Sequence, residues 1–212
     1  GLAARFRQRF TFAPDALAAH AYRAGQPAGP VLLLDDDRAV VRVAQGGPHG
    51  THWWLLRGLQ ATVVEGLHGA GRSPNRQCFA KFDGHQVTTH AGWDGPVITR
   101  LHLPHHAKAA RPGTAGCDEI LPFNDGLRVL WRDATGVYLL TPDAAQQLYP
   151  RAESNEAADA PEHPDAQVPQ AQPLLHMALS PDERFIAVGD QGGQHLLLNP
   201  RGEVLGRWAP LS

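Results

Sequence analysis

The stretch HMALSPDERFIAVGDQGGQHLLLNPRGEVLGRWAP, residues 176–210, decides the fold. It contains four short runs that are rich in branched apolar and aromatic residues. Three turn sequences separate these runs: Asp182-Glu183, the Gly-rich 191–194, and Arg201-Gly202. Apolar runs of this length between such turns are typical of antiparallel strands. The stretch therefore predicts a four-stranded antiparallel unit over 175–208, with Phe185, Ile186, Val188, Leu196 and Leu198 among its buried positions.

The same order of strands and turns recurs elsewhere in the chain. One copy covers 119–150, a second covers 30–67, and a degraded copy begins at Cys78. An acidic residue in the first turn of each copy marks the spacing; these residues are Asp36, Asp83, Asp125 and Asp182, with gaps of 47, 42 and 57 residues. A period of about 40–50 residues is typical of radial and solenoid repeat proteins.

The second and third runs of most copies are apolar without alternation, which predicts burial on both faces of each sheet. A blade packed between two neighbouring blades provides such burial. We therefore expect an all-β fold, a partial β-propeller of about four four-stranded antiparallel blades, with a β-sandwich of similar meanders as the alternative. The expected blades are 31–66, 77–110, 118–150 and 175–208. Residues 1–30 form an N-terminal segment or the remnant of a preceding blade, and the acidic, Pro-rich 151–173 predicts a disordered insertion.

The segment LSPDERFIAVGD, residues 179–190, resembles the SPDG-x-x-(I/L)-A-x-G signature of WD40, YVTN-type and TolB-type propeller repeats. Glu183 stands where the signature has Gly, and the Gly-His and Trp-Asp dipeptides of a strict WD40 repeat are missing from their usual places. The resemblance implies a WD40-like propeller of undecided subfamily. It also implies a non-enzymatic module that binds a protein or peptide through a loop-rich face.

Four blades are few for a closed ring, since propellers have about four to eight. The chain also begins without an initiator methionine, so we expect a fragment or an open arc. The two ends of an open arc expose apolar blade surfaces, which predicts self-association through them.

Composition narrows the classes of partner and the location. A net charge of −2 and a pI of about 6.7 give no basic footprint for nucleic acid. No apolar run approaches the length of a membrane span. Only Cys78 and Cys117 could form a disulfide, and whether they pair is open; so low a cysteine count favours a cytoplasmic protein. Of the 19 cations 17 are Arg, a bias typical of a GC-rich bacterial genome.

The candidate binding residues lie in the unusual loops 45–52, 68–77, 90–96 and 189–195. We expect these loops to share one face of the propeller, where function usually concentrates. Loop 68–77 combines glycines with two arginines, which could hold the carboxylate of a peptide or an acidic partner. We also expect Trp93 to be exposed. The candidate ligand- or partner-binding residues are His52, His68, Arg72, Asn75, Arg76, His90, Trp93, Asp94 and His195.

No motif in the chain specifies catalysis. None of the serines lies in a G-x-S-x-G turn, and the histidine spacing is not diagnostic of a metal, so no catalytic residue, metal or cofactor is predicted. The alternative is a propeller enzyme of the hydrolase, lactonase or quinoprotein kind. It would use His52, His90, His195 and Asp94 around a central metal or cofactor.

Overall fold

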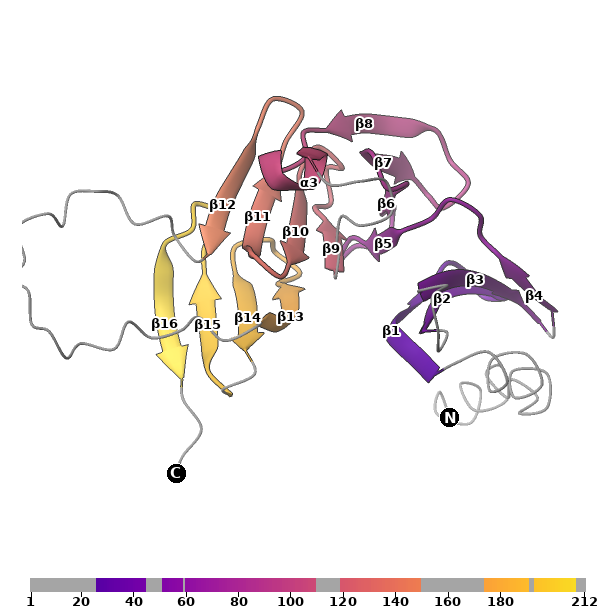
Figure 1. Ribbon diagram of the computed structural model, residues 1–212, viewed down its shortest axis with the longest axis horizontal. Helices are drawn as coiled ribbons and strands as arrows, with labels where there is room; N and C mark the ends of the chain where they lie inside the picture. The colour runs from indigo at the N-terminus through magenta and orange to yellow at the C-terminus, as the bar shows by residue number, and fades with distance from the viewer. Residues whose placement is uncertain are drawn as a thin grey trace, which may run out of the picture.

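The computed structural model describes residues 26–44, 51–58, 60–109, 119–149, 174–190 and 193–208. These residues form four four-stranded antiparallel sheets, in each of which the strands are ordered as in the sequence (Figure 1). Sheet A consists of β1 (Gln26–Leu33), β2 (Arg38–Ala44), β3 (Thr51–Arg57) and β4 (Gln60–Val63). Sheet B consists of β5 (Gly69–Arg72), β6 (Cys78–Phe82), β7 (Val87–Ala91) and β8 (Val97–Leu101). Sheet C consists of β9 (Glu119–Pro122), β10 (Val129–Asp133), β11 (Gly136–Leu140) and β12 (Ala145–Tyr149). Sheet D consists of β13 (Leu174–Leu179), β14 (Ile186–Asp190), β15 (His195–Leu198) and β16 (Val204–Trp208).

The expected fold class is confirmed: the described chain is nearly all β, with the four antiparallel sheets of a partial four-bladed propeller. The short helix α3 (His105–Ala109) follows sheet B. No helix in the described ranges is long and apolar enough to cross a membrane. Residues 1–25 and 151–173, on which two of the sequence predictions fall, lie outside the described residues.

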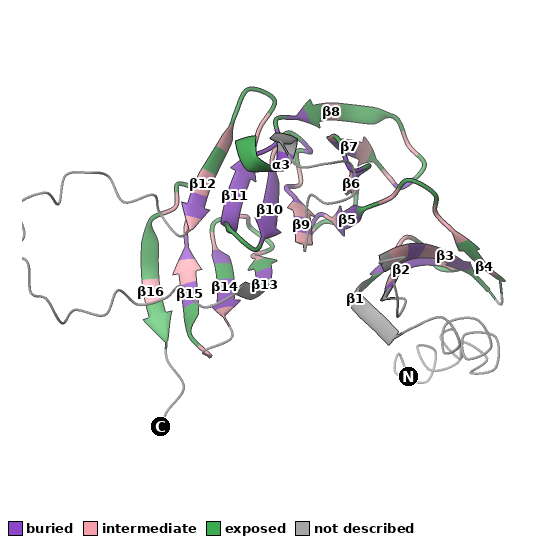
Figure 2. Cartoon of the chain, in the orientation of Figure 1, coloured by how far each residue is buried: buried purple, intermediate pink, exposed green. Residues whose placement is uncertain are grey.

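Apolar layers join each sheet to the next. Between sheets A and B the layer includes Val40, Trp53, Phe79 and Trp93. Between B and C it includes Phe82, Leu101, Trp131 and Leu140. Between C and D it includes Leu130, Leu139, Ile186 and Leu198. Strands β10 and β11 of sheet C are buried along their whole length, because this sheet is covered on both faces (Figure 2).

The first strand of each sheet lies on the inner side of the arc. The contacts between neighbouring sheets run mainly from β5 to β9 and from β9 to β13. Gly71 permits the closest approach, since a Cβ placed there would lie 1.7 Å from the Ile120 carbonyl oxygen. In a propeller, the strands that approach each other in this way surround the central axis.

Sheet D has one buried face and exposed apolar residues on its last strand. On sheet D the residues buried against sheet C include Ile186, Val188, Leu196 and Leu198, as expected, whereas Phe185 stays partly exposed beneath the Arg184 guanidinium. Exposed apolar residues gather on the last strand of this sheet, β16, which Figure 2 shows as largely exposed; they are Val204, Leu205 and Trp208.

The prediction for sheet B is wrong in one respect. The segment 68–77, interpreted as a connecting loop, contains strand β5 and the turn that follows it. Asp83 consequently lies in the second turn of this sheet, not the first. Cys78 is a free, buried thiol in β6, and burial raises its pKa to about 11. Cys117, whose pairing with Cys78 the sequence left open, lies outside the described residues.

Candidate functional site

Two hairpins, between β5 and β6 and between β13 and β14, share one hydrogen-bond pattern. The Ser73 amide donates to the Cys78 carbonyl over 2.8 Å, and the Ser180 amide donates to the Phe185 carbonyl over 2.9 Å. Each serine Oγ also accepts a 3.0 Å hydrogen bond from the amide at the far side of its turn. The Ser-Pro-Asn and Ser-Pro-Asp sequences therefore set the same turn twice.

The fourth residue of these turns has a positive φ. Arg76 has φ 67° and Glu183 has φ 61°, whereas the corresponding residue of sheet C is Gly126 with φ 70°. Positive φ favours glycine and is strained by roughly 1 kcal/mol or more in other residues. Two of the three turns therefore keep a large polar side chain in a position suited to glycine.

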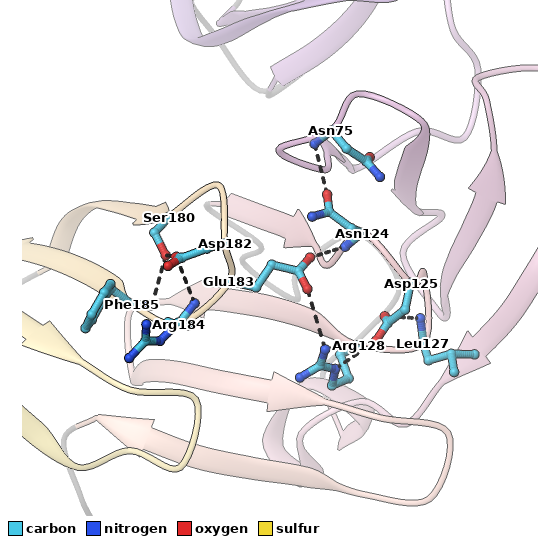
Figure 3. A network of polar contacts seen from close by, with 10 residues as sticks. All are labelled: Asn75, Asn124, Asp125, Leu127, Arg128, Ser180, Asp182, Glu183, Arg184 and Phe185. Atoms are coloured by element: carbon cyan, nitrogen blue, oxygen red, sulfur yellow. Dashed lines mark hydrogen bonds and ion pairs between the residues drawn. The ribbon is translucent and has the colours of Figure 1, made fainter.

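The first turns of sheets B, C and D are joined in a polar network (Figure 3). The Asn75 amide donates to Asn124 Oδ1 over 2.9 Å. The Asn124 amide in turn donates to Glu183 Oε1, and Glu183 Oε2 lies 3.7 Å from Arg128.

Because strands alternate in direction, the third-to-fourth turn of each sheet lies at the same end of the sheet as its first turn. We call this end the turn face. It consists of the first turns 34–37, 73–77, 124–128 and 180–185 and, among the described residues, of Gly58 and the third-to-fourth turns 92–96, 141–144 and 199–203.

Sheets A and B are also joined at the turn face. Arg38, which follows the first turn of sheet A, forms an ion pair with Asp94 in the third-to-fourth turn of sheet B. Arg38 also bonds Asp35, and this hydrogen bond lowers the pKa of Asp35. Arg72 donates from Nη1 to the carbonyl of Leu33. Asp94 and Arg72, two of the candidate residues, thus connect neighbouring sheets.

A cavity of about 340 Å³ lies between the inner strands β1, β5 and β9, beside this face. Its lining consists of Leu32, Ala70, Gly71, Arg72, Ser73, Pro74, Arg76, Glu119, Ile120 and Leu121. Burial, and secondarily the charge of Arg76, lowers the pKa of Arg72. The cavity is the strongest candidate site in the described residues.

Glu119 does not neutralise these two arginines. Its carboxylate lies 3.3 Å from Arg132 Nε and accepts a 3.0 Å hydrogen bond from the Met177 amide of sheet D. Burial raises the pKa of Glu119, although both contacts oppose that shift. The negative charge is therefore engaged by Arg132, and the mouth of the cavity remains cationic. In the described part of the chain the exposed Arg76 guanidinium makes no hydrogen bond or ion pair.

The sequence predicted that the candidate residues share one face, and the structure shows that they do not. Arg72, Asn75, Arg76, His90, Trp93 and Asp94 lie at or next to the turn face. His52 and His195 begin their strands, and His68 precedes β5, at the opposite end of the sheets. The prediction was wrong because 68–77 and 90–96 were interpreted as second-to-third turns or connections between blades. In the structure they contain the first turn and the third-to-fourth turn of sheet B.

The histidines proposed for the enzymatic alternative occupy third strands, β3, β7 and β15, rather than the inner first strands. His90 is engaged through Nδ1 with the Gly95 carbonyl at 3.1 Å and through Nε2 with Thr88 Oγ1 at 3.0 Å. Burial lowers the pKa of His90. Among the described residues, no group of three or more His, Cys, Asp or Glu side chains is placed to hold a metal ion.

Trp93 is buried, contrary to expectation, with 7% of its surface exposed. Its ring packs edge-on against Phe79 with 5.8 Å between centroids. Lys81 lies over the ring, with Nζ 4.3 Å from the centroid, and donates to the Trp93 carbonyl over 2.6 Å. The Gly-rich turn thus folds its tryptophan into the layer between sheets A and B, and burial lowers the pKa of Lys81.

Sequence reasoning missed a cluster that holds α3 against sheet C. Asp133 accepts from His106 Nε2 and from Trp131 Nε1, each at 2.7 Å, and from Thr135 Oγ1 at 2.6 Å. Burial would raise the pKa of Asp133, but these hydrogen bonds outweigh it and the pKa is lowered. The sequence does contain a signal for this cluster: the turn Asp-Ala-Thr-Gly, residues 133–136, and the two adjacent histidines at 105–106 that precede it.

This cluster has the residue types of a catalytic triad without its geometry. A triad histidine uses one ring nitrogen for the acid and the other for the nucleophile. Here the same nitrogen, His106 Nε2, faces Asp133 and lies 3.2 Å from Thr135 Oγ1. Thr135 also bonds Asp133 directly, so the arrangement fixes a helix and a turn and does not activate a hydroxyl.

No protein-family model and no curated protein matches this sequence. Solved structures similar to the chain include Hsv2 of Kluyvelomyces marxianus, with 9% identity, a TM-score of 0.44, and coverage of 69% of this chain and 40% of that chain. Another is AztD of Citrobacter koseri, with 14% identity, a TM-score of 0.46, and coverage of 87% and 46%. The chain spans less than half the length of both structures. At these scores the propeller-like fold rests on the four sheets themselves.

Proposed function

We propose that this chain is a WD40-like, non-enzymatic module that binds an acidic peptide or protein partner without a cofactor. A carboxylate of the partner would enter the cavity between β1, β5 and β9 and pair with Arg76 and Arg72. The supporting observation is that Arg72 and Arg76 line a cavity in which the Glu119 carboxylate is already engaged by Arg132. A carboxylate that accepts from both guanidinium groups would form charge-assisted hydrogen bonds.

A comparison of equivalent turn positions also supports this role for Arg76. Glu183 has a positive φ, and its side chain bonds the Asn124 amide of the neighbouring sheet, which offsets the strain. Arg76 carries the same strain, but its side chain has no such contact in the described residues. Strain that no internal contact offsets is a feature of ligand-binding positions.

The dimensions of the cavity fit a small part of a partner. Its volume of about 340 Å³ is at the lower end of the range for small-ligand pockets. An aspartate or glutamate side chain, or a terminal carboxylate with one neighbouring residue, fits within this volume. Asn75, between the lining residues Pro74 and Arg76 in the sequence, has an exposed side chain.

The test compares two exposed arginines on the turn face. Fluorescence anisotropy would follow a labelled hexaglutamate peptide and a hexaglutamine peptide of the same length at low salt. We expect Arg76→Ala to weaken hexaglutamate binding about tenfold, the effect of losing roughly 1.4 kcal/mol. The matched variant Arg201→Ala, in the third-to-fourth turn of sheet D, should change affinity less than about twofold.

Equal losses in the two variants would mean that the peptide responds only to overall charge, and the proposed site would be wrong. Equal binding of hexaglutamine would mean that the side-chain carboxylates are not recognised, which would also contradict the proposal. Because both substitutions keep the backbone conformation and concern exposed side chains, neither should unfold the chain.

A further inference from the structure

A row of four residues crosses the outer face of sheet D. In the strand register His176 pairs with Gly189, Gly189 pairs with His195, and His195 pairs with Trp208. Residues paired in this way point to the same face of a sheet. The next residues along the strands, Met177 and Leu196, are buried against sheet C, so the row points away from it. His176, His195 and Trp208 are exposed.

Gly189 allows the two histidines to meet. Their strands are separated by β14, which places the backbones about 9–10 Å apart. A Cβ at Gly189 would lie 2.2 Å from His176 Cε1 and 2.4 Å from Nε2, so the His176 ring occupies the space of the missing side chain. The ring thereby comes within 5.5 Å of the His195 ring, centroid to centroid.

The equivalent row in sheet C has a different composition. There Glu119 pairs with Arg132, Arg132 with Val137, and Val137 with Tyr149. Glu119 and Arg132 form an ion pair beneath sheet D, and Glu119 also bonds the Met177 amide. Two imidazoles and a glycine replace this ion pair at the outer face of sheet D, where the histidines are exposed.

We infer that His176 and His195 form a binding site for a divalent transition metal ion such as Zn²⁺. Imidazole nitrogens bind such ions at about 2.0–2.1 Å, so two rings on one tetrahedral ion have centroids about 5 Å apart. The observed centroid separation of 5.5 Å is close to that value, and both side chains are exposed. The remaining coordination positions open toward solvent, where water or a partner's side chain completes the shell.

The experiment is an isothermal titration of the whole chain with Zn²⁺ alone, compared across variants. The chain has 12 histidines, so the site is defined by differences between variants. His176→Ala and His195→Ala should each weaken the tightest Zn²⁺ binding at least tenfold, and the double variant should lose no more than either one. That lack of additivity is the signature of one shared ion.

Gly189→Ala supplies a test that keeps both imidazoles. A methyl group there takes the space of the His176 ring, so we expect the same loss of Zn²⁺ binding as in the single histidine variants. The matched control is His85→Ala, which removes an exposed histidine from the second turn of sheet B and should leave the tightest site unchanged. Additive losses for the two histidines, or full binding in Gly189→Ala, would overturn the inference.

Trp208 gives a second readout that does not depend on heat. As the register neighbour of His195, it lies next to the proposed ion, and bound Cu²⁺ should quench its fluorescence. Trp208→Phe should remove most of the saturable quenching, and so should His195→Ala. Quenching that survives in both variants would place the copper ion near another tryptophan and contradict the site.

Discussion

The first hairpins of sheets B and D have almost the same backbone and use it differently. Both begin with Ser-Pro, close with matching amide and hydroxyl hydrogen bonds, and hold their fourth residue at positive φ. In sheet D that residue, Glu183, bonds the preceding sheet. In sheet B it is Arg76, which faces the cavity instead. The same turn thus carries one side chain that joins two sheets and another that lines the cavity.

The sheets that follow the two hairpins also differ in how they are packed. Sheet B packs against sheet A through Phe79 and against sheet C through Phe82. Sheet D packs against sheet C only, among the described sheets, so its apolar residues divide into a buried and an outer set. Similar turns therefore begin two sheets that are packed differently, so substitutions in the two sheets should differ in their effect on stability.

The largest effect is expected for Leu198, which is fully buried between sheets C and D. Leu198→Ala should destabilise the fold by about 2–5 kcal/mol through lost burial and a residual cavity. Its neighbour Leu197 points to the outer face and is only partly buried, so Leu197→Ala should cost less than about 1 kcal/mol. Urea unfolding measures both. Equal losses would show that the outer face of sheet D is covered in solution, as the predicted self-association requires.

A smaller effect is expected when the hydroxyl that closes each hairpin is removed. Ser73 is buried, with 2% of its surface exposed, so Ser73→Ala leaves the Cys78 amide without a partner away from water. The expected cost is about 1–3 kcal/mol. Ser180 is more exposed, and Ser180→Ala should cost about 0.5–1.5 kcal/mol by the same chemical-denaturation measurement. A larger loss at Ser180 would contradict the equivalence of the two turns.

The sequence allowed the four sheets to be predicted because their strands are short, apolar and bounded by turn residues. It misplaced the start of sheet B, since β5, Gly-Ala-Gly-Arg, has no apolar run and two glycines. Strand β5 pairs along its length with β6, and Gly71 lies against Ile120, a residue far away in the chain. The correct signal was present as Ser-Pro-Asn followed by Cys-Phe-Ala, which matches Ser-Pro-Asp followed by Phe-Ile-Ala in sheet D.

The candidate site was also predicted only in part. Arg72, Asn75 and Arg76 were selected from the composition of one segment, and the structure places them around one turn. Their face was predicted wrongly, because the face depends on which strand precedes the turn. The burial of Trp93 and the engagement of Glu119 could not be predicted, since both result from packing between sheets.

Substituting the strained residue of each hairpin with glycine should give effects of opposite sign. Arg76→Gly relieves the positive φ without losing a described internal contact, so it should stabilise the fold by up to about 1 kcal/mol while weakening hexaglutamate binding. Glu183→Gly gains the same relief but loses the bonds to Asn124 and Arg128, for a net loss of about 1 kcal/mol. Thermal melting of both variants decides this. Destabilisation by Arg76→Gly would show that Arg76 supports the fold and is not held for a ligand.

The smallest expected effect is on acid stability, because the third residue differs between the hairpins: Asn75 in sheet B and Asp182 in sheet D. The Ser180 hydroxyl donates to Asp182 Oδ1 over 2.6 Å, and this bond, with the Arg184 amide, lowers the pKa of Asp182. A carboxyl whose pKa is lower in the folded state stabilises the fold above its unfolded value of about 3.9, and that stability is lost as the pH falls through the folded value. Asp182→Asn converts the turn to the sequence type of sheet B and removes this titration. Unfolding measured from pH 6 down to pH 2 should therefore show a slightly shallower loss of stability in Asp182→Asn than in the parent chain, whereas Asn75→Asp should make the loss steeper. Identical pH profiles would mean that the Ser180 hydroxyl bonds the carboxylate equally well in the unfolded chain, and the two hairpins would then be equivalent at this position.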